Sequence, residues 1–301
     1  MTEERVTEIQ TPKSAAARAI SLALSRRATV TTDIPSWERE EKWRRVTCYN
    51  VEETAGEYIF DFDKTLPCPI PRSLIITETH QCTGDRVWDA SVLLARFLEK
   101  EIRTLDNKFL KAPLSSSNTS PLRVAEIGAG QGLLSLVVAS LFPDKCFMKI
   151  IATDLAHVAT RMASNAIKNG FNISVSTEEN TFEESVNTNS SNNIQFNISE
   201  LKWGDRLAIQ RAMKWLGGNP HLLLASDLAA QISLMPSCVE TLAAFLSHET
   251  TLYLATNSQR DSTLPLVEGL REVDGVIIEK VNENEMPITS KWIDVWKVVK
   301  S

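Results

Sequence analysis

The chain has 301 residues, of which 43% are hydrophobic and 23% are charged, with a formal net charge of -6 and a pI near 5.4. This composition suits one large globular domain with an extension, and the apolar runs are far shorter than the roughly 20 residues that a bilayer span requires. The acidic balance disfavours a nucleic-acid substrate, because a phosphate backbone requires a basic binding surface. We therefore expect no membrane and no nucleic-acid partner, and a basic protein segment suits this chain better.

The cysteines and histidines indicate neither a metal site nor a catalytic nucleophile. None of the four histidines stands beside a plausible nucleophile. An odd number of cysteines without metal-site spacing is typical of reduced thiols in the cytoplasm, with the nucleus as an alternative. We expect a cytoplasmic monomer without a signal peptide. The five cysteines are Cys48, Cys68, Cys82, Cys146 and Cys238.

The first elements in chain order form an extension and a small antiparallel unit. Residues 1–56 are expected to be a partly ordered extension with a possible helix at 14–24, followed by a single domain at 57–301. Residues 57–62 and 73–79 alternate or run apolar, which predicts a small antiparallel element. An amphipathic helix that begins near Trp88 follows it.

A glycine-rich turn after an apolar strand is the strongest motif of the chain. Residues 124–135 read VAEIGAGQGLLS, so that Gly128, Gly130 and Gly132 stand between a buried strand and a helix. Glycines at such a turn admit a nucleotide-like group close to the backbone and to the free amides of the helix. The dinucleotide fingerprint needs its third glycine where this chain has Leu133. We therefore expect a nucleotide-cofactor loop of another kind, with a turn that binds nothing as the alternative.

A carboxylate follows the next strand. Residues 149–154 form a short apolar strand that ends at Asp154, one helix after the glycine turn, as a β-α-β unit requires. Asp154 can accept hydrogen bonds from both hydroxyls of a ribose. The alternative is that Asp154 caps the helix predicted from residue 155.

The rest of the chain alternates strands and helices. Residues 174–193 are rich in Ser, Asn, Thr and Glu, and we expect a polar insertion there. The later elements are predicted as strands at 221–226 and 251–256, helices at 234–247 and 264–273, and two final strands near 275–282 and 292–299.

Five short motifs occur in a fixed order: VWDA from residue 87, EIGAGQGL from 126, ATDL from 152, ELKWG from 200 and LASD from 224. In this order they resemble the METTL21-related seven-strand (class I) protein-lysine methyltransferases over about residues 75–300. The resemblance implies an α/β fold with a Rossmann-like seven-strand mixed sheet and helices on both faces. It also implies S-adenosyl-L-methionine as the cofactor and methyl transfer to a lysine of a cytosolic protein, such as a translation elongation factor or chaperone.

The same resemblance assigns site residues. Asp227, at the end of the strand at 221–226, is the candidate that orients the acceptor amine, with a structural helix cap or a loop hydrogen bond as the alternative. Relatives with lysine activity usually carry an aromatic residue three positions later, where this chain has Ala230. A silent methyltransferase-like binding protein, or an enzyme for another acceptor, is therefore the rival reading. The residues implied as cofactor contacts are Trp88, Gly128, Ala129, Gly130, Asp154, Trp203 and Ser226.

Overall fold

The structure is a computed structural model that describes residues 55–66, 73–79, 83–103, 120–142, 147–176, 193–228 and 231–301. The helix predicted at 14–24 and nearly all of the expected extension lie outside these residues, as does Ala230. Among the helices of the described ranges, none has the length and hydrophobicity of a membrane span.

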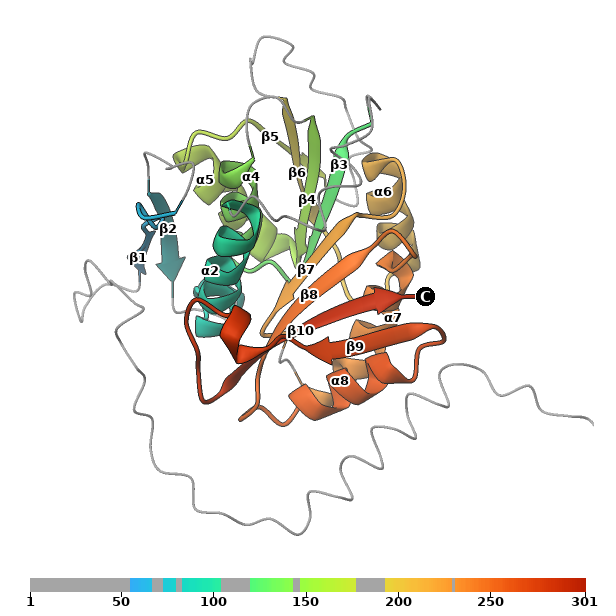
Figure 1. Cartoon of the computed structure of the whole chain (residues 1–301). Helices are drawn as coiled ribbons and strands as arrows, with labels where there is room; N and C mark the ends of the chain where they lie inside the picture. Colours follow the sequence, from blue (N-terminus) through green and yellow to red (C-terminus); the bar gives the residue numbers. More distant parts are fainter. Residues whose placement is uncertain are drawn as a thin grey trace, which may run out of the picture.

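The centre of the molecule is an eight-stranded mixed sheet in the order β5-β6-β4-β3-β7-β8-β10-β9 (Figure 1). The first six of these strands are parallel to one another, and β10 runs antiparallel to both β8 and β9. The predicted seven-strand arrangement is confirmed, with β5 added at one edge. The strands are β3 (Leu122–Ile127), β4 (Met148–Asp154), β5 (Ile173–Ser176), β6 (Ile194–Glu200), β7 (Leu222–Ser226), β8 (Thr251–Asn257), β9 (Val276–Lys280) and β10 (Ile293–Lys300).

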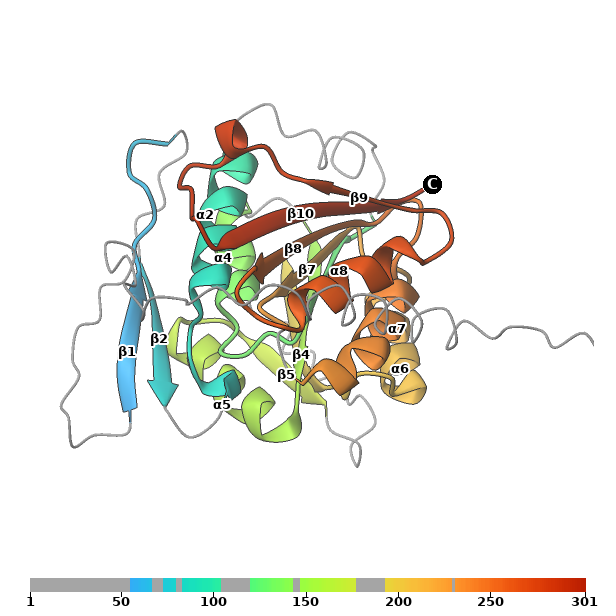
Figure 2. The ribbon, with the colours of Figure 1, turned by 90° about the horizontal axis from the view of Figure 1, so that it is seen from below.

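Helices cover both faces of the sheet. One group contains α2 (Asp89–Arg103), α4 (Leu133–Leu141) and α5 (Ala156–Lys168), and the other contains α6 (Arg206–Leu216), α7 (Met235–Phe245) and α8 (Thr263–Arg271), as Figure 2 shows. Three-residue 3-10 helices stand at Thr83–Asp85, Ile232–Leu234 and Glu283–Glu285.

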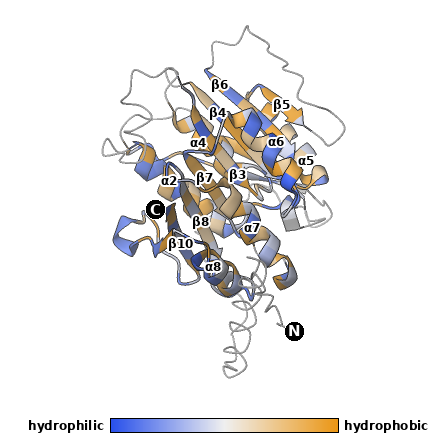
Figure 3. Cartoon of the chain, turned by 90° about the vertical axis from the view of Figure 1, so that its right-hand side faces the viewer, coloured by the Kyte–Doolittle hydropathy of each residue, from blue (hydrophilic) through white to orange (hydrophobic). Residues whose placement is uncertain are grey.

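The two-residue period of the strands produces a core on each face. Val124 packs with the α2, α4 and α5 group, whereas its neighbour Ala125 packs with the α6, α7 and α8 group. The central strands are accordingly coloured toward the hydrophobic end of the scale in Figure 3, while the outer helices carry both colours. The sheet is therefore buried on both sides, and its strand ends are left to carry a site.

The predicted antiparallel element is confirmed as β1 (Ala55–Phe60) paired with β2 (Leu74–Thr79) in a separate two-stranded sheet. Asparagine side chains of α5 bind its backbone: Asn165 Oδ1 accepts from Thr77 N at 2.8 Å, and Asn169 Oδ1 accepts from Ile75 N at 2.9 Å. Each asparagine also donates to the carbonyl of the same residue. Two amide side chains thus dock β2 against α5.

Two local elements differ from the sequence expectation. The start of the expected insertion is strand β5, whose Ser174 and Ser176 hydroxyls accept hydrogen bonds from the buried Asn197 amide of β6 at 2.8 and 2.9 Å. The two serine hydroxyls therefore have a partner within the sheet edge, whereas Oδ1 of Asn197 is buried without a hydrogen-bond partner in the described structure. Helix α6 had no predicted counterpart, although Asp205 caps its first turn through Leu207 N and Ala208 N, and Gly217 ends it in the left-handed conformation.

Candidate active site

The carboxyl ends of β3, β4 and β7 meet at one edge of the sheet, because these neighbouring strands are parallel. The segments that leave this edge are the glycine turn after Ile127, Leu155 after β4, and Asp227 after Ser226. In open sheets of parallel strands, ligands bind outside the carboxyl ends of the strands. The binding crevice lies where successive strands are added on opposite sides of the first strand. The parallel topology therefore brings most of the predicted site residues to one edge of the sheet.

The glycine turn needs glycine for steric reasons. Gly128, Gly130 and Gly132 have φ values of 65°, 55° and 84°, in the left-handed region that side chains disfavour. A Cβ on Gly128 would lie 2.4 Å from Leu228 Cδ2, and one on Gly132 would lie 2.7 Å from Met162 Cγ. The turn thus packs closely against Leu228, which follows β7, and against Met162 of α5. Trp203 Cζ2 lies 3.7 Å from the Gly128 Cβ position.

Asp154 points back at this turn. Its Oδ2 accepts from Gly130 N at 2.8 Å, and its Oδ1 accepts from Leu155 N at 2.7 Å. Burial raises the pKa of this carboxyl group above its ordinary value, and the two amide donors oppose that shift. Leu155, not Asp154, occupies the N-cap position of α5 and makes no side-chain cap bond. Asp154 is therefore a carboxylate oriented by two backbone amides and directed at the glycine turn.

Glu126 ties β3 to α4 behind the turn. It is 1% exposed, and its Oε2 accepts from Ser135 N at 2.9 Å and from Ser135 Oγ. Burial raises the pKa of Glu126 to about 8, with the Asp154 charge as a smaller cause in the same direction and the Ser135 donors opposing it. This residue belongs to the frame of the turn, and its carboxyl group faces the first turn of α4.

Asp227, Arg260 and Trp88 form a second cluster at the same edge. Asp227 has φ 47°, which makes it the one non-glycine residue with positive φ among the described ranges. Its Oδ2 forms an ion pair with Arg260 Nη2 at 3.0 Å, and the Arg260 guanidinium lies 4.7 Å from the centroid of the Trp88 ring. The Arg86 guanidinium lies 5.4 Å from the same ring.

The Asp227 carboxyl group is buried, and its two oxygens have different surroundings. The side chain is 4% exposed, and Oδ1 is buried without a hydrogen-bond partner in the structure described here. Burial raises the pKa of Asp227, the Arg260 charge and hydrogen bond lower it, and Asp89 adds a smaller upward effect. A buried acceptor atom without a donor marks a position where a ligand N–H or O–H can bind.

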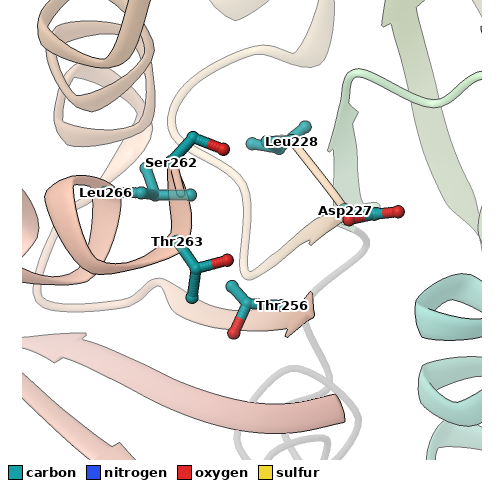
Figure 4. A pocket seen from close by; sticks show the side chains of 6 residues that line it. All are labelled: Asp227, Leu228, Thr256, Ser262, Thr263 and Leu266. Atoms are coloured by element: carbon teal, nitrogen blue, oxygen red, sulfur yellow. The ribbon is translucent and has the colours of Figure 1, made fainter. Parts of the chain in front are cut away.

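A small pocket adjoins Asp227 on its other side (Figure 4). In this view the carboxyl group of Asp227 points away from Ser262 and Thr263, so that the pocket and the carboxylate face different directions. The pocket is lined by Asp227, Leu228, Thr256, Ser262, Thr263 and Leu266.

The structure brings the predicted residues into two adjoining groups. The first group is the glycine turn and its neighbours: the turn contains Gly128, Ala129 and Gly130, and the side chains of Asp154 and Trp203 lie against it. Ala129 N donates to Thr153 O at 2.9 Å. The other predicted residues approach Asp227: Ser226 precedes it, and Trp88 is linked to it through Arg260.

The segment at 84–86 contacts both groups, because the Gly84 carbonyl oxygen lies 3.4 Å from the Gly130 Cβ position and the Arg86 guanidinium lies 5.4 Å from the Trp88 ring centroid. Sequence reasoning missed Arg260 and the bonds of Glu126. The available signal for Arg260 was its place just after the strand predicted at 251–256, at the same edge of the sheet. Within the described ranges, no group of three or more His, Cys, Asp or Glu residues is arranged to hold a metal ion.

Comparison with known proteins identifies the family. The family model described as lysine methyltransferase matches residues 71–272, more than half of the chain. Among solved structures, the Thermus thermophilus 16S rRNA N2 G1207 methyltransferase RsmC, in complex with AdoMet and guanosine, has a TM-score of 0.45 and 11% identity over 83% of this chain and 51% of that one.

Two further structures have similar scores. The precorrin-6y C5,15-methyltransferase of Geobacter metallireducens GS-15 has a TM-score of 0.39 and 14% identity, covering 62% of this chain and 82% of its own. TrmN from Thermus thermophilus has a TM-score of 0.38 and 17% identity, covering 66% and 54%. At these scores they carry no information about the acceptor. By its family match, its strand order and its glycine turn, the chain belongs to the lysine methyltransferase family, with a class I methyltransferase fold and S-adenosylmethionine as its cofactor.

Proposed function

We propose that this protein transfers a methyl group from S-adenosylmethionine to the side-chain amine of a lysine in a protein substrate. The observation that carries the proposal is Asp227, a buried carboxylate at the carboxyl end of β7 with one oxygen free to accept a hydrogen bond. The family match and the acidic net charge of -6 support a basic protein residue as the acceptor.

The residues around the glycine turn fit an adenosyl cofactor. The two oxygens of Asp154 are fixed by Gly130 N and Leu155 N, and each retains acceptor capacity for a ribose hydroxyl. Gly128 and Gly130 carry no side chain and Ala129 carries only a methyl group, which suits a ligand close to this backbone, and the Trp203 ring lies beside Gly128. We assign Trp88 and Ser226 to the side of the cofactor that faces Asp227, with Ser226 acting through its backbone.

The chemistry is an in-line displacement. The bound cofactor supplies a methyl group activated by its sulfonium, so the protein must align the amine and exclude water. The amine has to arrive neutral, because a protonated ammonium has no lone pair to attack the methyl carbon. Water or the Asp227 carboxylate would take the proton that the lysine ammonium loses to become neutral, and Asp227 Oδ1 would then accept an N–H of the neutral amine and orient its lone pair.

Position 230 bears on the rate of this reaction. Ala230 stands where the resembling enzymes usually carry an aromatic residue, and it lies outside the described residues. Trp88 lies 4.7 Å from the guanidinium of Arg260, the ion-pair partner of Asp227, and we assign its ring to the wall of the acceptor site in place of that aromatic residue. Alanine at position 230 is also the specific observation that favours a second candidate, a methyltransferase-like protein that binds the cofactor and a partner without transferring a methyl group.

The substrate class follows from the resemblance alone. Translation elongation factors and chaperones of the cytoplasm are the proteins that it favours, and we include them in the proposal at that level.

Methyl transfer to cell extract tests the proposal. Purified protein and S-adenosylmethionine with a radiolabelled methyl group are added to extract from cells that lack this enzyme, and the products are divided between protease and nuclease digestion. We expect label that protease releases and that nuclease leaves intact, with a strong decrease for Asp227→Asn at unchanged cofactor affinity. Label that only nuclease removes contradicts the protein acceptor. Normal cofactor binding without any transfer, for both proteins, favours the silent binding protein.

A further inference from the structure

Arg260 lies in the short connection between β8 and α8, and its backbone is held from several sides. Arg260 N donates to Asn257 O at 3.0 Å, and Arg260 O accepts from Thr263 N at 3.1 Å. The start of the same connection is bound to the residue just before β10, the strand next to β8 in the sheet, because Ser258 N donates to Trp292 O at 2.7 Å. The guanidinium is thus presented from a fixed loop at the carboxyl edge of the sheet.

The Arg260 side chain joins two of the predicted site residues. It donates to Asp227 Oδ2 at 3.0 Å and lies 4.7 Å from the Trp88 ring centroid, while it is itself 31% exposed. Trp88 comes just before α2 and Asp227 just after β7, so the contact connects segments far apart in the chain.

The ion pair uses only one oxygen of the carboxylate. Oδ1 of Asp227 stays buried and without a donor, although the side chain is almost fully enclosed. An Arg–carboxylate pair can be bidentate, and here the second oxygen is left out. The backbone at Asp227, with its φ of 47° and its N–H bonded to Ala255 O at 2.9 Å, fixes this orientation.

We propose that Arg260 is a positioning residue for the acceptor: it anchors Oδ2 of Asp227 and stacks on Trp88, so that Oδ1 alone is presented to the incoming amine. This inference rests on the proposed function of Asp227. The charged groups that act on Asp227 are Arg260, which stabilises its ionised form, and Asp89 at the start of α2, which opposes it. Removal of the guanidinium therefore leaves burial and Asp89 to raise the pKa of Asp227 further.

Three variants test the role of Arg260. Arg260→Met removes the charge and keeps an apolar chain, whereas Arg260→Lys keeps the charge and loses the planar fork. Arg271→Met is the matched control, because Arg271 also combines an ion pair, with Glu268 at 2.6 Å, and a ring contact, with Trp296 at 5.9 Å, at the far end of α8.

The first measurement needs no substrate. Carboxyl 13C NMR titration, with the Asp227 signal assigned by its loss in Asp227→Asn, reports the protonation of this residue directly. We expect Asp227 to titrate at higher pH in Arg260→Met, close to its original pH in Arg260→Lys, and unchanged in Arg271→Met. An unchanged titration in Arg260→Met overturns the role of Arg260.

The second measurement is methyl transfer to the same extract across pH. For Arg260→Met we expect the rate of methyl transfer at neutral pH to fall about ten- to a hundredfold, which corresponds to the loss of one charge-assisted hydrogen bond. We also expect the acidic limb of the pH–rate profile to move to higher pH. Affinity for S-adenosylmethionine should stay within about twofold. Faster transfer by Arg260→Met overturns the proposal, because Arg260 would then fill the acceptor position instead of preparing it. Absence of transfer by every protein overturns the proposed function, while the titration still decides how Asp227 is held.

Discussion

Replacement of Glu126 by glutamine tests how the glycine turn is held. Glu126 is 1% exposed, and burial raises the pKa of its carboxyl group to about 8 from the ordinary 4.5. Between these two pH values the folded protein holds a proton that the unfolded chain has released. The contribution of Glu126 to the free energy of unfolding is therefore fully present below about pH 4.5 and is lost as the pH rises through about 8.

The size of the loss follows from the shift in pKa. A difference of about 3.5 pH units corresponds to a decrease of about 5 kcal/mol in the free energy of unfolding, at about 1.4 kcal/mol per unit. Glutamine has the shape of the protonated acid, and its amide oxygen can still accept from Ser135 N and Ser135 Oγ. Glu126→Gln should therefore remove most of this pH dependence and stabilise the protein at pH 8 by a few kcal/mol.

Urea unfolding at pH 5.5 and at pH 8.0, for wild type and Glu126→Gln, measures this effect. Other groups titrate in the same range, but the difference between the two proteins isolates Glu126. Parallel pH dependence in the two proteins would refute the reasoning, since it would mean that Glu126 is ionised inside the fold at both values. Cofactor affinity should be similar in both proteins at pH 5.5.

Three further predictions concern the cofactor and the frame of the site. Asp154→Asn should weaken S-adenosylmethionine binding at least about tenfold in calorimetry, because one backbone amide then faces an NH2 group and a charge-assisted bond is lost; affinity equal to wild type would remove Asp154 from the site. Gly132→Ala should lower thermal stability more than Gly217→Ala, since both have φ near 84° but only the Gly132 Cβ would meet another side chain; equal losses would mean that Met162 yields freely. Asn165→Ala should cost about 1 to 3 kcal/mol and speed hydrogen exchange at Thr77, whose N–H loses its acceptor; unaltered exchange would show that β2 docks by other contacts.

Most of the fold could be predicted from local sequence patterns. The glycine turn, the strand that ends at Asp154 and the final elements each depend on residues a few positions apart, and these boundaries agree with the structure to within a few residues. Strand β5 was missed because its serines read as loop residues, and only the distant Asn197 gives them partners. Helix α6 carried its own signals in Asp205 and Gly217, which no expectation used.

The site was predictable where a motif is local and hidden where contacts are long-range. Sequence order places Asp154 one helix after the glycine turn, so their meeting follows from a β-α-β unit. The pairing of Asp227 with Arg260 spans 33 positions, and the stacking of Arg260 on Trp88 spans most of the domain. No periodicity links such residues, and only the folded sheet edge brings them together.

The identity of the methylated atom tests the proposed function most directly. Protein labelled by the radioactive methyl group is hydrolysed in acid to free amino acids, which are separated beside methyl-lysine standards, with Asp227→Asn as the control enzyme. We predict that the label migrates with methyl-lysine and falls sharply for Asp227→Asn, at equal cofactor affinity. Label on any other amino acid, or no label from a protein that binds the cofactor normally, would contradict the lysine methyltransferase activity proposed for this chain.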